Sequence, residues 1–335
     1  MCKAGRGKRY MSVVGGLVLS GLLAYLAVRG VAWSEVLLGL RGVRYGFLLL
    51  TAGGVVASLA LRAWRWAVIL RPVQRVRTWP LFAITAVGYL AILAIPFRIG
   101  EVVRPVLLAG RERVPLSSAV ASLVVERCLD GLAFAALVVT VATWIPLPDW
   151  ARPLGYGMGG AYLLLLGFLA WAWLARERGL LVISRIAEWT LPSKAAAVGA
   201  IAQSFVQGLR VLPDFRNLAT AILLSGGLWF AGTGINYASF FALGLDLPLV
   251  AAATLQVLLT LGVLLPAAPA SVGSFHFFAV MGLRLFGVPD PLAVSYAILV
   301  HATSMLVHAA VGIGCGLALQ VTRWRKLESM VPGHR

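Results

Sequence analysis

Six charged residues lie inside or at the edges of hydrophobic segments between positions 96 and 130. Because charged side chains at membrane depth are costly, they usually face a cavity or pair with one another, and they often mark a transport pathway. The alternative interpretation is interfacial, with arginine stems that reach to the lipid headgroups. The block supplies both signs of charge at helical spacing, which favours a polar site. Its residues are Arg98, Glu101, Arg104, Glu126, Arg127 and Asp130.

This combination of charges suits a lipid headgroup. Arginine binds phosphate through two parallel hydrogen bonds and keeps its charge when partly desolvated. We therefore expect Arg98 and Arg104 to contact a phosphate and Glu101 to orient them. Glu126 and Asp130 are spaced i, i+4, so both carboxylates fall on one face of a helix, where they would hold a cationic headgroup or transfer a proton. A competing and compatible interpretation is an internal salt-bridge network that fastens this segment to the next helix.

The composition defines the class of protein that must position these residues. The chain has 335 residues, of which 60% are hydrophobic and 12% are charged, and its mean hydropathy is +0.90. These values are typical of a polytopic membrane protein. The net charge of +17 comes from basic residues beside apolar segments, which favours anionic lipid headgroups over nucleic acid. Cys2, Cys128 and Cys315 share no ligand spacing, so we expect neither a disulfide framework nor a metal site.

Apolar runs predict an all-α helix bundle that forms a single transmembrane domain over residues 11–322. Between 176 and 216 charged and apolar residues are mixed, and we expect amphipathic helices on the membrane there that join two halves, 11–175 and 217–322. Residues 1–10 and 323–335 are expected to be basic cytoplasmic ends. The expected apolar segments are 11–28, 45–61 or slightly beyond, 79–95, 117–144, 154–175, 218–243, 249–265, 277–288 and 291–320.

Topology predicts six to eight spans with two broken or re-entrant segments. If basic loops stay inside, the N-terminus is cytoplasmic, residues 29–44 form an outer connection and 98–113 form a cytoplasmic loop. Residues 79–97 must then enter and leave on the cytoplasmic side, and 249–288 on the outer side. Proline and glycine interrupt both stretches, and paired broken segments in two halves indicate a transporter with inverted repeats. The alternative is a plain eight-span protein with one weakly biased loop.

Two further groups of residues have alternative interpretations. The segment Arg62-Ala63-Trp64-Arg65-Trp66 alternates arginine with tryptophan, which suits the headgroup level of a membrane. His276, His301 and His308 suggest a metal, but no acidic partner or short ligand spacing supports one. Histidines that pack between helices are the simpler interpretation, and we expect no metal and no cofactor.

Three polar motifs interrupt the apolar sequence and together resemble a known family. They are Pro96-x-Arg98-x-Gly100-Glu101-x-x-Arg104 with the following Ser117-Ser118-Ala119 and Val125-Glu126-Arg127-x-x-Asp130; Pro266-x-x-Pro269-x-Ser271-x-Gly273-x-Phe275; and Arg62-x-x-Arg65-Trp66. The set resembles the membrane region of lysylphosphatidylglycerol synthases, which also occurs as stand-alone flippase-like membrane proteins. The resemblance covers nearly the whole chain and adds Arg62, Arg65, Pro269 and Gly273 as secondary site residues.

The resemblance implies a bundle that moves or accommodates lipids across the bilayer. In bifunctional relatives this region translocates aminoacylated phosphatidylglycerol, which a soluble C-terminal domain makes from aminoacyl-tRNA. Only 15 residues follow Gln320, so we expect no synthase activity. Stand-alone relatives are associated with varied lipids, including polyprenyl-linked sugars and hopanoid pathways. We expect a lipid translocator, not an enzyme, in the inner membrane of a bacterium or archaeon, with anionic or lipid-linked membrane lipids as partners and no nucleic acid.

Two other functions stay open. The first is a non-transporting membrane partner of a lipid-synthesising or lipid-modifying enzyme. This alternative predicts that Glu126→Gln leaves the function of the chain intact. A membrane glycosyltransferase or phosphotransferase would need acidic residues gathered in a soluble loop, and residues 176–216 hold only Glu177, Glu188 and Asp214. The sequence lacks a phosphate-binding loop, so we expect no direct use of ATP.

Overall fold

The computed structural model describes residues 4–95, 100–145, 149, 151–190, 195–265 and 269–328. Of these ranges it describes the side chains within residues 15–320, except those of residues 151, 152 and 269. Helices fill almost all of them, and the described ranges contain no strand, which confirms the all-α expectation. The helices are α1 (Ala4–Val28), α2 (Trp33–Arg41), α3 (Tyr45–Leu70), α4 (Thr78–Ala94), α5 (Gly100–Glu112), α6 (Leu116–Trp144), α7 (Ala151–Leu174), α8 (Arg176–Thr190), α9 (Ala195–Gly208), α10 (Phe215–Ala242), α11 (Leu249–Leu264), the short 3-10 turn η3 (Pro269–Ser271), α12 (Ser274–Arg284) and α13 (Asp290–Glu328).

Several helices are suited to cross a membrane. Within the described residues, four are long and apolar enough: Tyr45–Leu70, Pro153–Leu174, Phe215–Ala242 and Asp290–Gln320. A fifth span results if α1 and α2, which meet at a bend of 83°, count as one. The chain is therefore a polytopic helical membrane protein. A count of six spans would also include α6, which carries three charges, and a count of eight would add the short apolar helices α4 and α11. The count of six to eight therefore stays a prediction.

Two local expectations differ from the structure. Residues 33–41, within the expected outer connection, form α2, and Val36 of this helix is buried; the side of the membrane on which they lie stays a prediction. The expected loop 98–113 holds α5, because Gly100, Arg104 and Leu108 recur every four residues and are buried on one face. The second apolar segment does not end near residue 61, since α3 continues to Leu70.

The two halves repeat the same order of elements in opposite directions. Near one end of α3 the amide of Arg44 donates to the carbonyl of Ala242, 2.8 Å away, and near its other end Arg65 contacts Ser225. Numbers therefore rise along α3 as they fall along α10, and the helices are antiparallel. A short helix, a break, a second short helix and a long helix follow each of them: α4–α5–α6 and α11–α12–α13.

The packing of these elements corresponds between the halves. Helix α4 packs on α5 and on α13, just as α11 packs on α12 and on α6. Each broken segment is therefore a pair of short helices that fold back on each other and contact the long last helix of the other half. This is the arrangement that inverted repeats with re-entrant segments predict.

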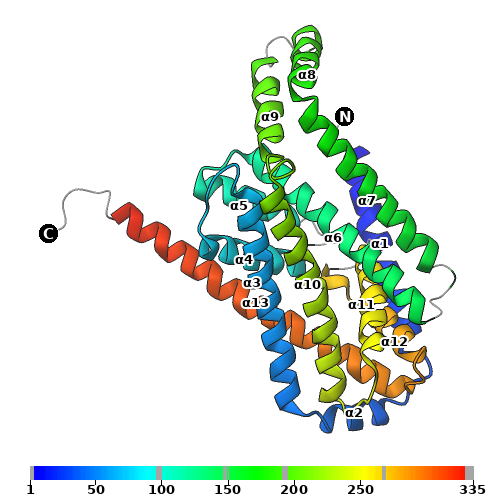
Figure 1. Ribbon diagram of the computed structural model, residues 1–335. Helices are drawn as coiled ribbons and strands as arrows, with labels where there is room; N and C mark the ends of the chain where they lie inside the picture. Colours follow the sequence, from blue (N-terminus) through cyan, green and yellow to red (C-terminus); the bar gives the residue numbers. More distant parts are fainter. Residues whose placement is uncertain are drawn as a thin grey trace.

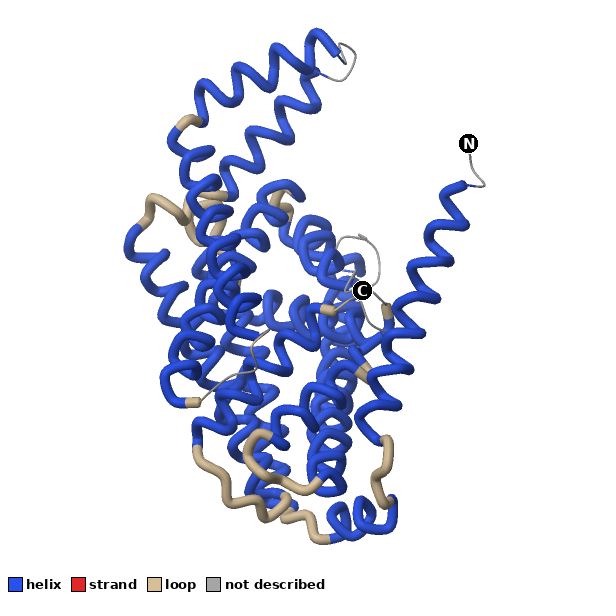
Figure 2. Tube along the Cα trace, turned by 90° about the vertical axis from the view of Figure 1, so that its right-hand side faces the viewer, coloured by secondary structure: helices blue, strands red, loops and turns tan. Residues whose placement is uncertain are grey.

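The connection between the halves is a pair of helices. Helix α8 continues beyond α7, and α9 returns beside it, so that the two project past the end of the bundle (Figures 1 and 2). Two helices are thus present in 176–216, where amphipathic helices were predicted. They pair with each other, and α9 also packs on α6.

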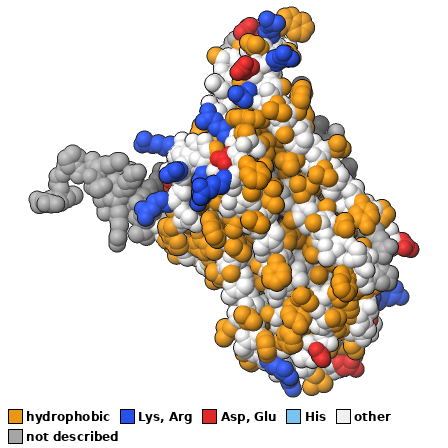
Figure 3. Space-filling view, in the orientation of Figure 1, with side chains coloured by type: hydrophobic (Ala, Val, Ile, Leu, Met, Phe, Trp, Pro, Cys, Tyr) orange, Lys and Arg blue, Asp and Glu red, His pale blue; other side chains and the backbone are white. Residues whose placement is uncertain are grey.

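Apolar side chains cover the flank of the molecule as well as its core. Leu164, Leu174 and Leu223 are more than three-quarters exposed, and orange side chains spread over the middle of the molecule in Figure 3. Contiguous exposed apolar surface of this kind is unusual in soluble proteins and fits contact with lipid. Beneath it, Phe134, Phe240 and Tyr296 belong to the largest buried cluster, which joins α6 to the second half.

Candidate functional site

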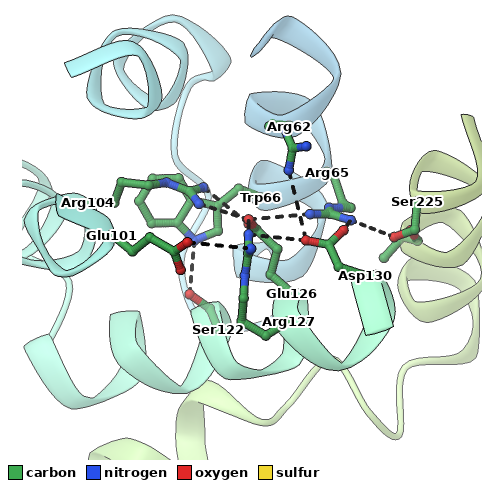
Figure 4. Close-up of polar contacts among 11 residues, drawn as sticks. Arg62, Arg65, Trp66, Glu101, Arg104, Ser122, Glu126, Arg127, Asp130 and Ser225 are labelled. Atoms are coloured by element: carbon green, nitrogen blue, oxygen red, sulfur yellow. Dashed lines mark hydrogen bonds and ion pairs between the residues drawn. The ribbon is translucent and has the colours of Figure 1, made fainter. Parts of the chain in front are cut away.

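A network of seven charged residues lies where α3, α5 and α6 meet (Figure 4). We call it the charged network. Helix α3 contributes two arginines near its end, α5 contributes one residue of each sign, and α6 contributes three residues from one turn. The members are Arg62, Arg65, Glu101, Arg104, Glu126, Arg127 and Asp130.

Glu126 is the centre of the network. Arg104 approaches it with two nitrogens, with Nη1 2.8 Å from Oε1 and Nη2 3.2 Å from Oε2. Arg127 donates to Oε1 at 2.8 Å, and Nη2 of Arg65 lies 3.3 Å from the same oxygen. The Glu126 side chain is 0% exposed, so three arginines replace the water that this carboxylate loses.

Asp130 forms the second centre, one helical turn further along α6. Arg65 donates to its Oδ1 at 2.5 Å, and Nη2 of Arg127 lies 3.1 Å from Oδ2. Arg62 is at a longer distance of 3.9 Å. Arg65 also donates to the hydroxyl of Ser225 at 2.8 Å, so the network reaches α10 and couples the two halves.

The arginine–tryptophan segment 62–66 is partly buried, although the sequence predicted that it lies at the headgroup level of the membrane. The Arg104 guanidinium lies 4.5 Å from the centre of the Trp66 ring, and the indole N–H of Trp66 donates to Ser122 at 3.0 Å. Trp66 and Arg65 are fully buried, whereas Trp64 is 48% exposed. Successive residues of a helix differ by about 100° in direction, so the continuation of α3 to Leu70 turns the two tryptophans to different faces.

One edge of the network is open. The side chains of Arg62, Arg127 and Glu101 are 26%, 29% and 22% exposed, and that of Asp130 is 15% exposed. Four arginines against three carboxylates leave one excess positive charge in these seven residues. Among the described residues, the Nε atoms of Arg65, Arg104 and Arg127 are buried and have no hydrogen-bond partner. A cationic cluster with partly exposed guanidinium groups at one edge is suited to bind an anion there.

Comparison with known proteins identifies the family. Residues 13–312 match the family model described as "Lysylphosphatidylglycerol synthase TM region", which is most of the chain. The chain belongs to this family. A curated relative from Haloferax volcanii, "Glycosyltransferase AglD", is 28% identical over 351 residues, which cover 96% of this chain and 56% of the relative. The chain thus spans about half the length of that relative.

The structure brings together most of the residues that the family motifs singled out. Glu101, Arg104, Glu126, Arg127 and Asp130 all join the charged network. Arg62 and Arg65, predicted as secondary, belong to the same network. Arg98 lies outside the described residues, so its expected contact with a phosphate stays a prediction.

The second family motif lies in the other half of the molecule. Ala270, Ser271 and Gly273 have positive φ angles of 58°, 56° and 94°, in the turn between α11 and α12. At Gly273 a Cβ atom would overlap the carbonyl oxygen of Ser20, so only glycine fits this close approach of α1. Pro269 belongs to η3, and its side chain is outside the described set. The role of Pro269 and Gly273 in binding stays a prediction.

The histidines contact protein groups. His301 Nε2 lies 3.0 Å from the carbonyl oxygen of Ala270, and Phe275 stacks on its ring at 4.5 Å. His308 Nδ1 lies 2.7 Å from the carbonyl oxygen of Ser304, and Tyr89 stacks on it at 5.0 Å. Within the described residues, no group of three His, Cys, Asp or Glu side chains could hold a metal ion.

Four residues around the network were not predicted as site residues. They are Trp66, which covers Arg104; Ser122, which anchors Trp66; Ser225, which binds Arg65; and Tyr89, whose ring lies 5.5 Å from the Arg62 guanidinium. Trp66 carries a signal, because it directly follows Arg65 in a family motif. Ser225 carries none, since only the packing of α10 on α3 brings it to the site.

Proposed function

We propose that this protein is a flippase-like lipid translocator that holds the phosphate of a lipid headgroup at the open edge of the charged network. The observation that carries the proposal is the excess positive charge of the network together with its two partly exposed arginines, Arg62 and Arg127, whose side chains are 26% and 29% exposed. A phosphodiester carries one negative charge and several acceptor oxygens. It would neutralise the network and accept hydrogen bonds from these two arginines at the open edge.

The carboxylates divide into two roles in this proposal. Glu126 has three arginine partners and no exposed surface, so it positions Arg65, Arg104 and Arg127 and does not meet a cationic headgroup itself. Asp130 and Glu101 lie at the open edge. They are the carboxylates that the amine of an aminoacylated or zwitterionic lipid would reach.

The architecture supports movement of a bound lipid. Two broken segments, α4–α5 and α11–α12, occur in antiparallel halves, and each packs on the long last helix of the other half. Transporters of this kind expose a site near the middle of the bilayer to one side and then the other by rocking one repeat against its counterpart. The contact between Arg65 and Ser225 crosses the boundary between halves, so headgroup binding at the network would influence such a rearrangement.

The substrate class is a lipid phosphate. It is shared by phospholipids and by lipid-linked sugars, and the name of the relative "Glycosyltransferase AglD" supports the lipid-linked class as the second candidate. We propose the same location as for the sequence-based expectation: a bacterial or archaeal cell membrane, with the N-terminus in the cytoplasm. A lipid-synthesising enzyme is the proposed protein partner, and no enzymatic activity is proposed for this chain.

Native mass spectrometry of the purified protein with its co-purified lipids tests the site. We expect one lipid class to be retained by the wild type and lost in Arg127→Gln, Arg98→Ala and Glu126→Gln. Arg284→Gln is the matched control, because Arg284 pairs with Asp290 in an exposed ion pair away from the network. The same lipid profile in all five proteins would refute the headgroup site and favour a non-transporting partner.

Reconstitution tests translocation separately. In liposomes that contain a fluorescent analogue of the retained lipid, the wild type is expected to expose inner-leaflet analogue to an external quencher. Arg62→Gln and Arg127→Gln are expected to slow this exposure, and Arg284→Gln is not. A wild type that retains the lipid without exchanging it would refute the translocator and leave a lipid-binding partner protein.

A further inference from the structure

A second basic site lies far along the chain from the charged network, where α7 passes into α8. A cavity of about 200 Å³ is lined there by residues of α7 and α8 on one side, and of α9 and the turn after it on the other. The lining residues are Trp173, Arg176, Glu177, Leu180, Gln203, Val206, Gln207 and Arg210.

The cavity is built from two matching helical stripes. Residues 173, 176, 177 and 180 are spaced i, i+3, i+4 and i+7, and residues 203, 206, 207 and 210 have the same spacing. Side chains at this spacing share one face of a helix, so each arm of the projecting pair presents one continuous face to the other. Each face carries one arginine, Arg176 on α8 and Arg210 just beyond α9. The sequence alone did not indicate that these stripes face each other.

The polar groups of the cavity suit a phosphate. Two guanidinium groups and one carboxylate, Glu177, leave an excess of one positive charge among the lining residues, and Gln203 and Gln207 supply amide donors. The Arg176 guanidinium lies 4.8 Å from the centre of the Trp173 ring, a contact that orients a guanidinium while its N–H groups stay available. Basic side chains also gather at this end of the molecule in Figure 3.

The position of the cavity selects a lipid as the source of the phosphate. The apolar span in α7 ends at Leu174, so Arg176 follows it by two residues and stands at headgroup level. Trp171 and Leu174 are 62% and 79% exposed, and they offer apolar surface on the flank of α7 within about two turns of Arg176. Tryptophan is typical of this level of a membrane. A lipid could therefore place its phosphate between the arginines and its acyl chains along α7.

We propose that this cavity binds the phosphate of an anionic phospholipid and thereby holds the α8–α9 pair at the membrane surface. The net positive charge of the site favours a headgroup with one negative charge, such as phosphatidylglycerol. Phosphatidylcholine carries an additional trimethylammonium group that the arginines repel. The site shares no residue with the charged network, so the two proposals can fail independently.

Lipid titrations monitored by native mass spectrometry on the full chain test this site. The wild type is expected to bind phosphatidylglycerol more tightly than phosphatidylcholine, and the double variant Arg176→Gln/Arg210→Gln is expected to bind phosphatidylglycerol about tenfold more weakly. Arg185→Gln is the matched control, since Arg185 is an exposed arginine of α8 outside the cavity. Glu177→Gln should strengthen binding, because it removes the only negative charge of the lining.

Two results would overturn the proposal. Equal affinity of the wild type and the double variant for phosphatidylglycerol would show that the arginines do not form a lipid site. Displacement of phosphatidylglycerol by millimolar glycerol phosphate would identify a site for soluble phosphate compounds instead. A double variant with lysine at both positions keeps the charges, and its retained selectivity for phosphatidylglycerol would exclude misfolding as the cause of weaker binding in the glutamine variant.

Discussion

Arg104 and Glu126 form a buried two-point ion pair between α5 and α6, with nitrogen–oxygen distances of 2.8 and 3.2 Å. Their side chains are 2% and 0% exposed. The removal of both ions from water costs several kcal/mol per ion, roughly as much as their attraction returns. Net stability is therefore a weak reason to place this pair in the interior. The pair does fix the broken segment α4–α5 to the long helix α6, which supports a role in positioning the site.

Loss of one partner of this pair should be costly. Glu126→Gln leaves Arg65, Arg104 and Arg127 close together without the carboxylate that all three contact. We expect a loss of stability of about 3–5 kcal/mol, as for other buried ion pairs that lose one member. The measurement is the unfolding temperature of the purified protein in detergent.

The exposed pair Arg284–Asp290 is the control for that experiment. Its side chains are 46% and 40% exposed, and an ion pair in water contributes at most about 1 kcal/mol. Arg284→Gln should therefore change the unfolding temperature little. Equal shifts for Glu126→Gln and Arg284→Gln would contradict the buried geometry of the network.

A glycine of α4 gives an independent test of the Arg104 position. A Cβ atom at Gly88 would overlap Cγ of Arg104, which cannot move aside easily because its guanidinium is held by Glu126 and covered by Trp66. We expect Gly88→Ala to cost about 1–3 kcal/mol and to weaken retention of the bound lipid. Thermal unfolding and lipid analysis by mass spectrometry measure the two effects.

Gly53 of α3 supplies the matched substitution. Nothing lies within 4 Å of a Cβ atom built there, and alanine is the better helix former by roughly 0.5–1 kcal/mol. Gly53→Ala should leave stability equal or slightly higher and lipid retention unchanged. If Gly88→Ala behaved in the same way, the close packing of α4 on Arg104 would be wrong.

Residue spacing and apolar runs in the sequence predicted the helices and the residues that share a face of a helix. The i, i+4 spacing placed Glu126 and Asp130 on one face of α6, and both do contact Arg65 and Arg127. Apolar runs predicted the long helices, and proline and glycine marked the breaks between α4 and α5 and between α11 and α12. The family motifs contain all seven members of the charged network.

The remaining features depend on contacts between distant segments. Arg65 and Trp66 looked interfacial because arginine and tryptophan favour headgroups, but four carboxylate and hydroxyl partners from α6 and α10 make their burial possible. Ser225 is an ordinary serine in an apolar helix until α10 packs against α3. The same holds for the cavity between α8 and α9, whose two stripes lie about 30 residues apart in sequence.

The antiparallel contact of α3 with α10 can be tested by cross-linking. Oγ1 of Thr51 and Oγ of Ser239 are 3.1 Å apart, so cysteines at these positions would need only a small shift to form a disulfide. In a background without Cys2, Cys128 and Cys315, we expect Thr51→Cys/Ser239→Cys to form an intramolecular cross-link under mild oxidation. Peptide mass spectrometry identifies the linked fragments.

The pair Thr51→Cys/Ser225→Cys is the negative control for this cross-link. Ser225 and Ser239 are 14 residues apart on α10, or about 20 Å along a helix axis. A cross-link to position 225 in place of 239 would show that the helices are parallel, and it would remove the basis for inverted halves.

The start of α10 should depend on pH through Asp214. The backbone amide of Asn217 donates to Oδ1 of Asp214 at 3.1 Å, and its side-chain amide donates to Oδ2 at 2.7 Å. These hydrogen bonds, with that of the backbone amide first, hold the pKa of Asp214 below its ordinary value. A lowered pKa in the folded state means that this cap stabilises the helix above the unfolded pKa of about 3.9. The contribution is lost as the pH falls through the folded value.

Hydrogen exchange of the first turn of α10 measures the effect of this cap. Asp214→Ala should increase exchange of the Asn217 amide at neutral pH, because that donor loses its acceptor. Asp214→Asn should keep the amide protected, since asparagine also caps helices, and should abolish the pH dependence below about pH 4. Protection that falls on acidification to the same extent in the wild type and in Asp214→Asn would contradict this assignment, because another titrating group would then control the junction between the α8–α9 pair and the second half.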